Sequence, residues 1–447
     1  MSGMDKKDWI VGVGAPLQGR IRVPGDKSVS HRAIMLASLA EGVSRIDDFL
    51  EGEDTRATAA VFQQLGVKIE APSPQSRIVH GVGLRGLRAS ADALDCGNAG
   101  TGMRLLAGVL AGQAFDTTLI GDASLSKRPM RRVIDPLMTM GARIDSDAGG
   151  LPPLRIRGGA ALRGIDYELP VASAQVKSAL LLAGLYADGD TTVREPHPTR
   201  DYTERMLSAF GWPIEFSPGI ARVRGGADAR HALRATDVSV PADFSSAAFF
   251  LVAASVIPGS DLTLEAVGMN PRRTGLLHAL RMMGADIVES HARNQGGEAV
   301  ADLRVRAAQL QGIEVPEALV PDMIDEFPAL FVAAACASGN TRVSGAAELR
   351  VKESDRLATM SSALRTLGIR VDEFDDGAVI HGGAFVLDPQ SSVVIDSHGD
   401  HRIAMAAAIA GQRCRGEFRI GDIANVATSF PGFDALARGV GFSLREA

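Results

Sequence analysis

The 447-residue chain has few cysteines, few aromatic residues and no long apolar segment. Its three cysteines, Cys96, Cys336 and Cys414, are far apart and have no metal-ligand spacing, which argues against a zinc site or a disulfide framework and indicates a reducing, cytoplasmic location. The longest apolar runs, such as residues 247–256, fall well short of the roughly 20 residues that a membrane-spanning helix needs. Residues 1–9 have no apolar core behind their lysines, so a secretory signal is not expected.

Several function classes lack support in the sequence. The net charge of −6 argues against a nucleic-acid surface. The chain contains no G-x-x-x-x-G-K-[ST] loop for a nucleoside triphosphate and no G-x-S-x-G nucleophile elbow. The cysteines and histidines form no cluster in the sequence, so we expect no metal and no cofactor.

One sequence pattern is present six times. Each copy opens with Pro or Asp, passes through small and polar residues, becomes rich in Ala and Leu, and ends at Gly. The copies lie at 23–42, 94–112, 169–189, 240–259, 320–339 and 396–416. A shorter pattern, an apolar residue followed by Gly, recurs at 65–69, 140–144, 210–214, 283–287, 367–371 and 440–444. This period indicates one supersecondary unit that is used six times.

The first copy predicts the order of elements in each unit. Residues 28–40 have the spacing of a helix, 44–49 of a strand and 54–65 of a second helix, and a strand begins at 67–69. Repeated, this order predicts an α/β fold of six βαβ-type units. The chain is too long for one ordinary core, and a division near Val240 leaves three units on each side. The sequence does not say which domain contains the N-terminal strand expected around 9–23.

Polar residues stand at the starts of the predicted buried helices. Lys27 and Ser28 begin the first, Asn98 stands near the second, where Gly100 lets a ligand approach the backbone, and Gln175 stands near the third. A helix N-terminus presents unpaired N–H groups and a partial positive charge, so it favours anions. Each segment alone could be only a helix cap. The fourth start, 242–250, has only an acid and serines, and we expect it to be structural.

Arginines and acids add to this pattern. Arg is suited to grip carboxylate and phosphate groups, although any one arginine could instead lie on a solvated face. Likewise, Lys352 and Glu353 could form a plain helix ion pair, and His401 could be a structural histidine. Asp325, at the fifth helix start, is either an N-cap or a proton-transfer group. The segments are 126–132 with Lys127 and Arg128, 348–356 with Lys352, Glu353 and Arg356, and 399–405 with His401 and Arg402. The residues therefore predict an enzyme that acts on anionic substrates by acid–base chemistry, with a silent repeat scaffold as the alternative from another class.

The chain resembles the enolpyruvyl transferases, and among them the members that act on shikimate 3-phosphate. The strings that carry this resemblance are PGDKSVSHRA, GNAGTGMRL, KRPM, SAQVKSALLLAGL, ELRVKESDR, DHRIAM and TSFP, in this order over essentially the whole chain. The resemblance implies two domains, each of three βαβαββ units related by a pseudo-threefold. One domain would contain 24–240, and the other 1–23 with 241–447. The implied reaction transfers the enolpyruvyl group of phosphoenolpyruvate to the 5-hydroxyl of shikimate 3-phosphate and releases phosphate through a tetrahedral intermediate.

The resemblance also implies residue roles. Asp325 would take the proton from the 5-hydroxyl, Glu353 with Lys27 would protonate the methylene carbon, and His401 would lie close by. Shikimate 3-phosphate would be bound by Lys27, Ser28, Arg32, Ser173, Ala174, Gln175, Arg200, Asp325 and Lys352. Phosphoenolpyruvate would be bound by Lys27, Asn98, Gly100, Arg128, Gln175, Arg356 and Arg402.

Two positions bear on substrate and inhibitor. Thr428 stands where many family members have a lysine that would contact phosphoenolpyruvate. The string SAQVKS resembles members that the herbicide glyphosate does not inhibit, but Gly100 is the residue of members that it inhibits, so we expect glyphosate to compete with phosphoenolpyruvate. We expect a monomer without nucleic-acid or membrane partners.

The nearest alternative function is that of UDP-N-acetylglucosamine enolpyruvyl transferase. That enzyme usually has Lys-Asn where this chain has Lys27-Ser28, and a reactive cysteine in the loop that here spans 121–130.

Overall fold

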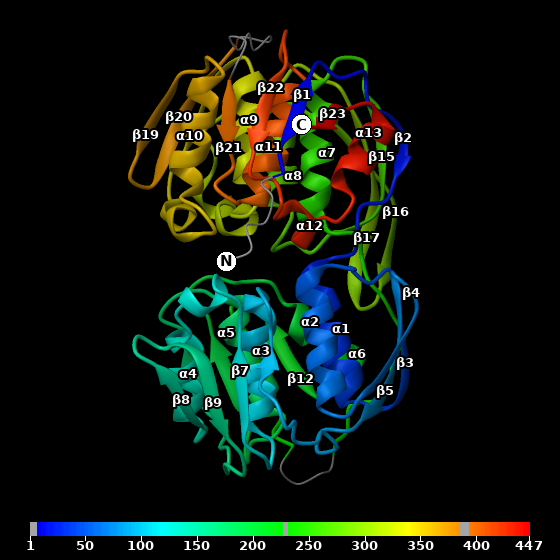
Figure 1. The fold of residues 1–447 in the computed structure, drawn as a ribbon, viewed down its shortest axis with the longest axis vertical. Helices are drawn as coiled ribbons and strands as arrows, with labels where there is room; N and C mark the ends of the chain where they lie inside the picture. Colours follow the sequence, from blue (N-terminus) through cyan, green and yellow to red (C-terminus); the bar gives the residue numbers. More distant parts are fainter. Residues whose placement is uncertain (1–6, 227–230, 384–392) are drawn as a thin grey trace. The chain divides into compact units, whose positions relative to one another are not determined.

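The computed structural model describes residues 7–226, 231–383 and 393–447, and it contains two compact units (Figure 1). The first, here called the N-repeat unit, comprises Gly25–Pro241 with Asn294–Glu298. The second, the C-repeat unit, comprises Met1–Pro24, Ala242–Arg293 and Ala299–Ala447. The sequence division assigned all of 241–447 to one domain; in the structure the short segment Asn294–Glu298 groups with the other unit.

The N-repeat unit contains three four-stranded sheets, one for each repeat. In each sheet the first two strands in spatial order are parallel, and the remaining pairs are antiparallel. In spatial order the strands are β14 (Val238–Ser239), β3 (Glu41–Asp47), β5 (Ser76–Val82) and β4 (Lys68–Ser73); β6 (Leu94–Asp95), β7 (Thr117–Ile120), β9 (Leu151–Arg157) and β8 (Arg143–Asp147); and β10 (Asp166–Glu168), β11 (Thr191–Arg194), β13 (Ile220–Val223) and β12 (Ile214–Ser217).

The C-repeat unit repeats this plan in two four-stranded sheets and one three-stranded sheet. In the three-stranded sheet, two isolated parallel bridges beside β18 stand where the other sheets have a parallel strand. In spatial order the strands are β16 (Asp286–Gln295), β17 (Glu298–Arg306), β15 (Asp261–Gly268) and β2 (Gln18–Ile21); β18 (Gly339–Val343), β20 (Gly377–Gly382) and β19 (Val371–Phe374); and β21 (Val394–Asp396), β22 (Phe418–Gly421), β1 (Trp9–Gly12) and β23 (Ser443–Glu446). The predicted α/β class with six repeated units is confirmed.

The N-terminal segment, whose attachment the sequence left open, forms two strands of the C-repeat unit. β1 pairs antiparallel with both β22 and β23, so the start of the chain completes the last sheet. β2 pairs parallel with β15, although the chain continues from β2 into the first helix of the N-repeat unit. Reciprocally, β14 pairs parallel with β3 and then leads into the first helix of the C-repeat unit. The strand that precedes the first helix of each unit therefore belongs to a sheet of the other unit.

The first helix of each repeat is buried. In α7 (Phe244–Val256) and α9 (Phe327–Cys336) every residue is buried, because their sequences are apolar on all sides. These helices and their equivalents form the core of each unit. The others are α1 (Lys27–Leu39), α3 (Gly100–Ala111), α5 (Ala174–Gly184) and α11 (His401–Gly411).

The second helix of each repeat ends at the glycine of the shorter sequence pattern. All six glycines have positive φ, from 79° at Gly211 to 124° at Gly441, and Val67 N donates to Phe62 O at 3.0 Å, as in a Schellman cap. The recurrent glycine therefore marks a left-handed helix end. These helices are α2 (Glu53–Gln64), α4 (Arg131–Thr139), α6 (Tyr202–Ala209), α8 (Gly275–Met282), α10 (Arg356–Thr366) and α13 (Phe433–Val440); the shorter ones are α12 (Val426–Ser429), η1 (Leu125–Lys127), η2 (Glu317–Leu319), η3 (Pro321–Met323) and η4 (Ala347–Val351).

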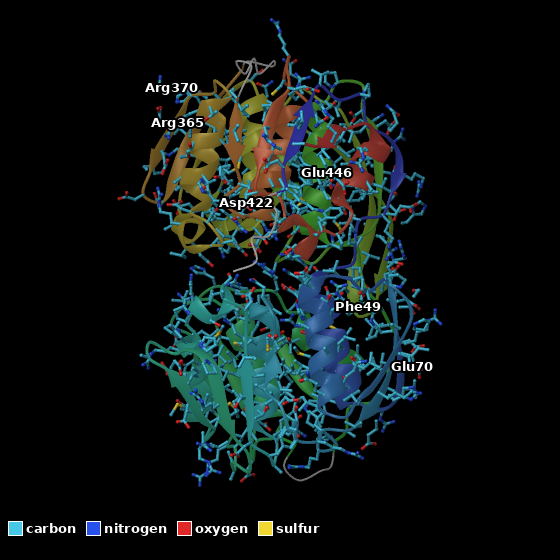
Figure 2. The ribbon with its side chains drawn as sticks, in the orientation of Figure 1. Phe49, Glu70, Arg365, Arg370, Asp422 and Glu446 are labelled. Atoms are coloured by element: carbon cyan, nitrogen blue, oxygen red, sulfur yellow. The ribbon has the colours of Figure 1, made fainter. Side chains whose placement is uncertain are left out.

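The side chains follow the same division between core and surface (Figure 2). Phe49 is 1% exposed and belongs to the core of the N-repeat unit, whereas Glu70 and Arg370 are exposed. No helix within the described residues is both long and apolar enough to cross a membrane.

Candidate active site

The residues singled out in the sequence fall into two groups, one in each unit, and each group lies at or near helix starts. The N-repeat unit holds Lys27, Ser28, Arg32, Asn98, Gly100, Arg128, Ser173, Ala174, Gln175 and Arg200. The C-repeat unit holds Asp325, Lys352, Glu353, Arg356, His401 and Arg402.

Lys27 is the first residue of α1, as its sequence predicted. The preceding Asp26 caps the helix by accepting a hydrogen bond from Val29 N at 2.9 Å. The Lys27 side chain is 32% exposed, and its Nζ lies 3.2 Å from Asp54 Oδ2 on α2. Asp54 thus holds the ammonium group beside the positive end of the helix, where it can meet an anionic ligand.

The second and third helix starts of the N-repeat unit are joined by hydrogen bonds. Gln175 Nε2 donates to Thr101 Oγ1 at 2.7 Å, and Gln175 Oε1 accepts from Arg104 Nη1 at 3.0 Å. Arg128 Nη2 donates to Asn98 Oδ1 at 2.8 Å. The structure therefore brings residues that are far apart in the sequence, such as Thr101 and Gln175 at a separation of 74 positions, into one polar cluster.

Gly100 lies tightly between two guanidinium groups. A Cβ atom added at Gly100 would lie 3.1 Å from Arg104 Nη1 and 3.2 Å from Arg128 Nη1. Burial, followed by repulsion from Arg128 and Arg132, lowers the pKa of Arg104 to about 10. Arg104 was not assigned to the site from the sequence, although it lies one helical turn after Gly100 in the same motif.

Arg32 is buried, and its donors are engaged by protein oxygens. It donates to Thr203 Oγ1 at 2.7 Å, to Ser178 Oγ at 2.8 Å and to the Ser28 carbonyl oxygen at 2.8 Å. Burial lowers its pKa to about 10, against the attraction of Glu204 and Asp26. In this structure Arg32 ties α1 to α5 and α6, and its predicted contact with substrate stays a prediction.

Ser173 and Arg200 both lie in the third repeat, one just before α5 and the other just before α6. Ser173 is the N-cap of α5, and its hydroxyl accepts from Val176 N at 3.4 Å. Ala174 is the first residue of this helix, and Arg200 lies half-buried just before α6. The cap interpretation of Ser173 is thus correct, and a ligand-binding role for it stays a prediction.

A buried ion triad supports this region. Lys177 Nζ lies 2.8 Å from Glu195 Oε2 and 2.8 Å from Glu204 Oε1, and the three side chains are 3%, 1% and 2% exposed. Glu195 also accepts from Thr199 N at 3.2 Å, so the triad holds the segment that leads to Arg200 against α5.

Replacing Lys177 with Met is expected to destabilise the N-repeat unit by about 3–5 kcal/mol, because two buried carboxylates lose their cation. Urea unfolding followed by fluorescence would measure this loss. Lys68→Met is the matched control, since Lys68 pairs with Glu70 at 2.8 Å but is 66% exposed, and a loss of about 0–1 kcal/mol is expected there. Equal losses in the two variants would contradict the structural role of the triad.

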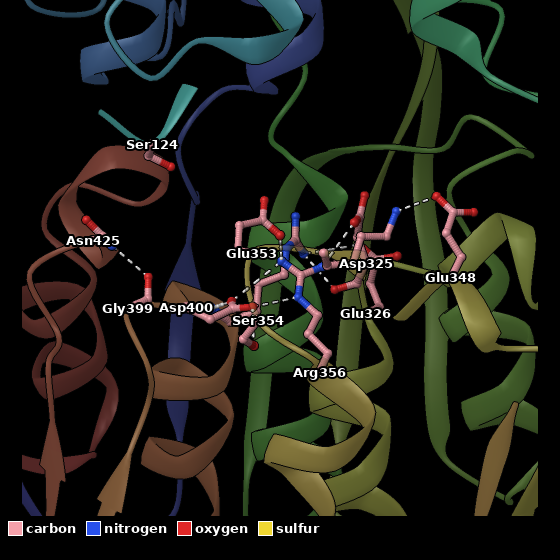
Figure 3. Close-up of polar contacts among 12 residues, drawn as sticks. Ser124, Asp325, Glu326, Glu348, Glu353, Ser354, Arg356, Gly399, Asp400 and Asn425 are labelled. Atoms are coloured by element: carbon pink, nitrogen blue, oxygen red, sulfur yellow. Dashed lines mark hydrogen bonds and ion pairs between the residues drawn. The ribbon is translucent and has the colours of Figure 1, made fainter. Parts of the chain in front are cut away.

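Arg356 is the centre of the C-repeat group. It is 1% exposed, and one guanidinium contacts three carboxylates (Figure 3). Nε donates to Asp400 Oδ2 at 2.8 Å, Nη2 donates to Glu353 Oε2 at 2.6 Å, and Nη1 lies 3.3 Å from Asp325 Oδ1. The planar fork of arginine allows this division of donors, so Arg356 orients both predicted proton-transfer acids.

Glu353 is ionised in this arrangement. Burial raises its pKa, but the positive charges of Arg356 and His401 outweigh burial and lower the pKa to about 2. Its side chain is 40% exposed. As the structure stands, Glu353 is therefore a proton acceptor at neutral pH, and a proton donor only after its surroundings change.

The sixth helix start adds a second arginine. Asp400 caps α11 by accepting from Arg402 N at 2.9 Å, and His401 is the first residue of the helix. Arg402 Nη1 donates to the Asp325 carbonyl oxygen at 2.8 Å and lies 3.6 Å from Glu326 Oε1. Asp400 was not assigned to the site from the sequence, and its position in the DHRIAM string was the available signal.

Lys352 has a different partner from the one considered in the sequence. Its Nζ lies 2.6 Å from Glu348 Oε1, whereas the adjacent Glu353 pairs with Arg356. Arg350 fixes the segment by donating to Asp355 Oδ2 at 2.9 Å and to the Phe374 carbonyl oxygen at 2.7 Å. A simple ion pair between Lys352 and Glu353 is therefore the wrong interpretation.

Thr428 forms a local hydrogen bond within its own turn. Its Oγ1 donates to the Asn425 carbonyl oxygen at 2.7 Å. Asn425 Nδ2 in turn donates to the Gly399 carbonyl oxygen at 2.7 Å, which joins this turn to the segment before α11 (Figure 3).

Within the described residues, no group of three His, Cys, Asp or Glu side chains is arranged to hold a metal ion.

These repeated sheets and buried helices have the architecture of the enolpyruvyl transferases. The enolpyruvyl transferase NikO from Streptomyces tendae matches with a TM-score of 0.78 over 99% of both chains, at 18% identity, which shows the fold. The chain belongs to the EPSP synthase family, because the model of EPSP synthase (3-phosphoshikimate 1-carboxyvinyltransferase) matches residues 11–436.

Similar proteins support this assignment over the whole length. A 3-phosphoshikimate 1-carboxyvinyltransferase from Xanthomonas campestris pv. campestris is 70% identical over 98% of both chains. One from Xanthomonas axonopodis pv. citri is 69% identical over 98% of both chains. The solved EPSP synthase from Acinetobacter baumannii is 49% identical and covers 99% of this chain and 100% of its own, with a TM-score of 0.91. The enolpyruvyl transferase resemblance of the sequence is confirmed.

Proposed function

We propose that the protein transfers the enolpyruvyl group of phosphoenolpyruvate to the 5-hydroxyl of shikimate 3-phosphate and releases phosphate, a step of aromatic amino acid biosynthesis. Membership of the EPSP synthase family and relatives at 70% identity named for this reaction support the proposal. The structural observation that carries it is the buried Arg356, which holds Asp325 and Glu353 as a pair of acids. The reaction needs one group to accept a proton and another to donate one.

The first step forms a carbon–oxygen bond. Asp325 accepts the proton of the 5-hydroxyl, the oxygen attacks C2 of phosphoenolpyruvate, and C3 takes up a proton to give a tetrahedral intermediate. In the second step C3 loses a proton while the C2–phosphate bond breaks, which leaves the enolpyruvyl ether and inorganic phosphate. Asp325 is suited to the first role because its carboxylate is held in place by arginine.

Glu353 becomes a proton donor when substrate draws Arg356 away from it. In the structure the pKa of Glu353 is about 2, so its protonated form is scarce at neutral pH. A bound phosphoenolpyruvate carboxylate competes for Arg356 and adds negative charge, and both effects raise the pKa of Glu353. Substrate binding therefore prepares the acid that protonates C3, together with Lys27.

The N-repeat residues bind the anionic groups. Lys27 at the start of α1 and Arg128 beside Gly100 supply positive charge, and the helix starts supply N–H groups. Fixed cations of this kind stabilise the charge that develops in the transition state, which is usually the largest catalytic contribution.

A coupled assay of phosphate release tests this function directly. Shikimate 3-phosphate with phosphoenolpyruvate should release phosphate, and UDP-N-acetylglucosamine with phosphoenolpyruvate should not. Release with the sugar nucleotide alone would assign the chain to the sister reaction, and release with neither would refute the proposal.

We propose that glyphosate competes with phosphoenolpyruvate and that Gly100 admits it. In Gly100→Ala the new methyl group would press on Arg104 and Arg128 at 3.1 and 3.2 Å. The methyl group displaces the guanidinium groups that hold the inhibitor at a cost of about 1–3 kcal/mol, so the Ki for glyphosate should rise about 5- to 150-fold. Inhibition kinetics at varied phosphoenolpyruvate concentration would show whether glyphosate competes and would give the Ki of each enzyme. A wild-type enzyme without competition at millimolar glyphosate, or an unchanged Ki in the variant, would contradict this.

We also propose that the chain acts as a monomer in the cytoplasm. Cys96, Cys336 and Cys414 are all buried as thiols, which fits a reducing compartment. Size-exclusion chromatography with light scattering would report the mass, for which 46.9 kDa is expected.

A further inference from the structure

The fourth helix start carries more than a cap. Asp243 is the N-cap of α7 and accepts from Ser245 N at 3.1 Å, as the sequence led us to expect of a structural start. Both residues also contact Arg273, a buried arginine just before α8. Arg273 Nη2 donates to Asp243 Oδ1 at 2.9 Å and to Ser245 Oγ at 2.6 Å.

Arg273 also reaches the proposed base. Its Nη1 lies 3.6 Å from Asp325 Oδ2, while Arg356 Nη1 lies 3.3 Å from Asp325 Oδ1. The two carboxylate oxygens of Asp325 therefore have separate arginine contacts, one from the segment before α8 and one from α10. Cations beside both oxygens oppose rotation of the carboxylate, Arg356 by a hydrogen bond and Arg273 by its charge at the longer distance.

Ser245 extends the network to the residue after Asp325. Its hydroxyl donates to Glu326 Oε1, and Glu326 Oε1 also lies 3.6 Å from Arg402 Nη1. Burial raises the pKa of Glu326, against the attraction of Arg273 and Arg402. The starts of α7, α9 and α11 are thus connected through side chains that are nearly or wholly buried.

We propose that Arg273 is a positioning residue that holds the Asp325 carboxylate in its proton-accepting orientation, anchored by Asp243 and Ser245. This inference rests on the proposed function. Arg356 divides its donors among Asp400, Glu353 and Asp325 and must also meet the substrate. Arg273 is 6% exposed and is tied to α7, so it keeps its place when Arg356 turns to the ligand.

The charge around Asp325 sets the sign of the expected pH effect. Arg273 from the segment before α8 and Arg356 from α10 contact its carboxylate, and Arg402 from α11 donates to its carbonyl oxygen, while His401 on α11 acts on the neighbouring Glu353. The acids that act on it directly are Glu326 on its own segment and Glu353, and Asp243 before α7 and Asp400 before α11 share its two arginines. Removing the charge of Arg273 takes away one of the two arginines that contact the carboxylate, which raises the pKa of Asp325, so a higher pH is needed to ionise it.

The test compares Arg273→Gln and Arg273→Lys with Arg272→Gln. Arg272 is the adjacent residue, is 35% exposed and pairs with Asp322 at 3.2 Å, so it controls for disturbance of the segment. In Arg273→Gln, kcat should fall about 10- to 100-fold, with both KM values within about threefold, and the acidic limb of the kcat–pH profile should move to higher pH. Arg273→Lys should return the acidic limb toward its wild-type pH and restore part of kcat. The kcat of Arg272→Gln should stay within about twofold of wild type.

An Arg273→Gln variant that keeps its kcat and its acidic limb, but melts at a lower temperature, would overturn the proposal and leave Arg273 a purely structural role. If Arg273→Gln does not fold, Ser245→Ala replaces it, since it removes one anchor only. A fall in kcat of about 3- to 10-fold with the same direction of limb shift is expected there, and no change would overturn the proposal.

A second measurement does not depend on turnover. The crystal structure of Arg273→Gln should show the Asp325 carboxylate rotated away from its wild-type position. An unmoved carboxylate would refute the positioning role even in an inactive protein. Absence of activity in the wild-type protein would instead refute the proposed function.

Discussion

Lys27→Ala is expected to lower kcat/KM by about 10³- to 10⁴-fold, the largest loss from a single substitution in the N-repeat unit. Loss of a charge-assisted hydrogen bond costs about 1.5–3 kcal/mol and raises KM for the anionic substrates about 10- to 100-fold. Loss of a fixed cation that stabilises developing charge lowers kcat by about 10²-fold more. Steady-state kinetics with each substrate varied in turn would measure both parts.

Two companion variants separate charge from folding in this experiment. Lys27→Arg keeps the positive charge near Asp54 and should recover part of the binding loss. Lys68→Ala removes an exposed lysine, 66% accessible, and should leave kcat/KM unchanged. An unchanged kcat in Lys27→Ala, with only KM raised, would limit Lys27 to binding and remove it from the protonation step.

Asp325→Asn is expected to lower kcat by about 10²- to 10⁴-fold, with KM for shikimate 3-phosphate changed only a few-fold. The amide has nearly the shape of the carboxylate but cannot accept the 5-hydroxyl proton, and general-base catalysis contributes about this much. Folding should persist, because the substitution reduces the excess of acids around Arg356.

The matched control for this variant is Asp322→Asn. Asp322 lies three residues earlier in the same turn and pairs with Arg272 at 3.2 Å, so it undergoes the same change away from the proposed base. Its kcat should remain within about twofold of wild type. Wild-type rates in Asp325→Asn would refute the assignment of Asp325 as the base.

Local sequence signals predicted much of the fold. The helix expected at 28–40 is α1 (Lys27–Leu39), and the second, expected at 54–65, is α2 (Glu53–Gln64). These agree because caps, apolar spacing and a terminal glycine act within a few residues. The pairing of β14 with β3 and of β2 with β15 was not predicted, because partners such as Ile46 and Val238 (192 residues apart) or Gln18 and Asp261 (243 residues apart) leave no local pattern.

The site divides in the same way. Helix starts with Lys27, Gly100 or Arg402 were visible because their motifs are continuous in the sequence. Arg273 lies in no such motif, and its proposed positioning role depends on contacts with Asp243, Ser245 and Asp325, which come from two other segments. The charge state of Glu353 also depends on folding, because Arg356 and His401 lower its pKa only when they are brought together.

The position of β1 has a consequence for synthesis on the ribosome. β1 (Trp9–Gly12) emerges first, yet its partners β22 and β23 lie at the other end of the chain. The N-repeat unit is almost continuous from Gly25 to Pro241 and can begin to fold as soon as it has emerged. The strand Trp9–Gly12 must wait through nearly all of translation with its hydrogen-bonding edges unpaired. The interval before the last residues appear is therefore the period in which a nascent chain of this family most needs protection from wrong pairing.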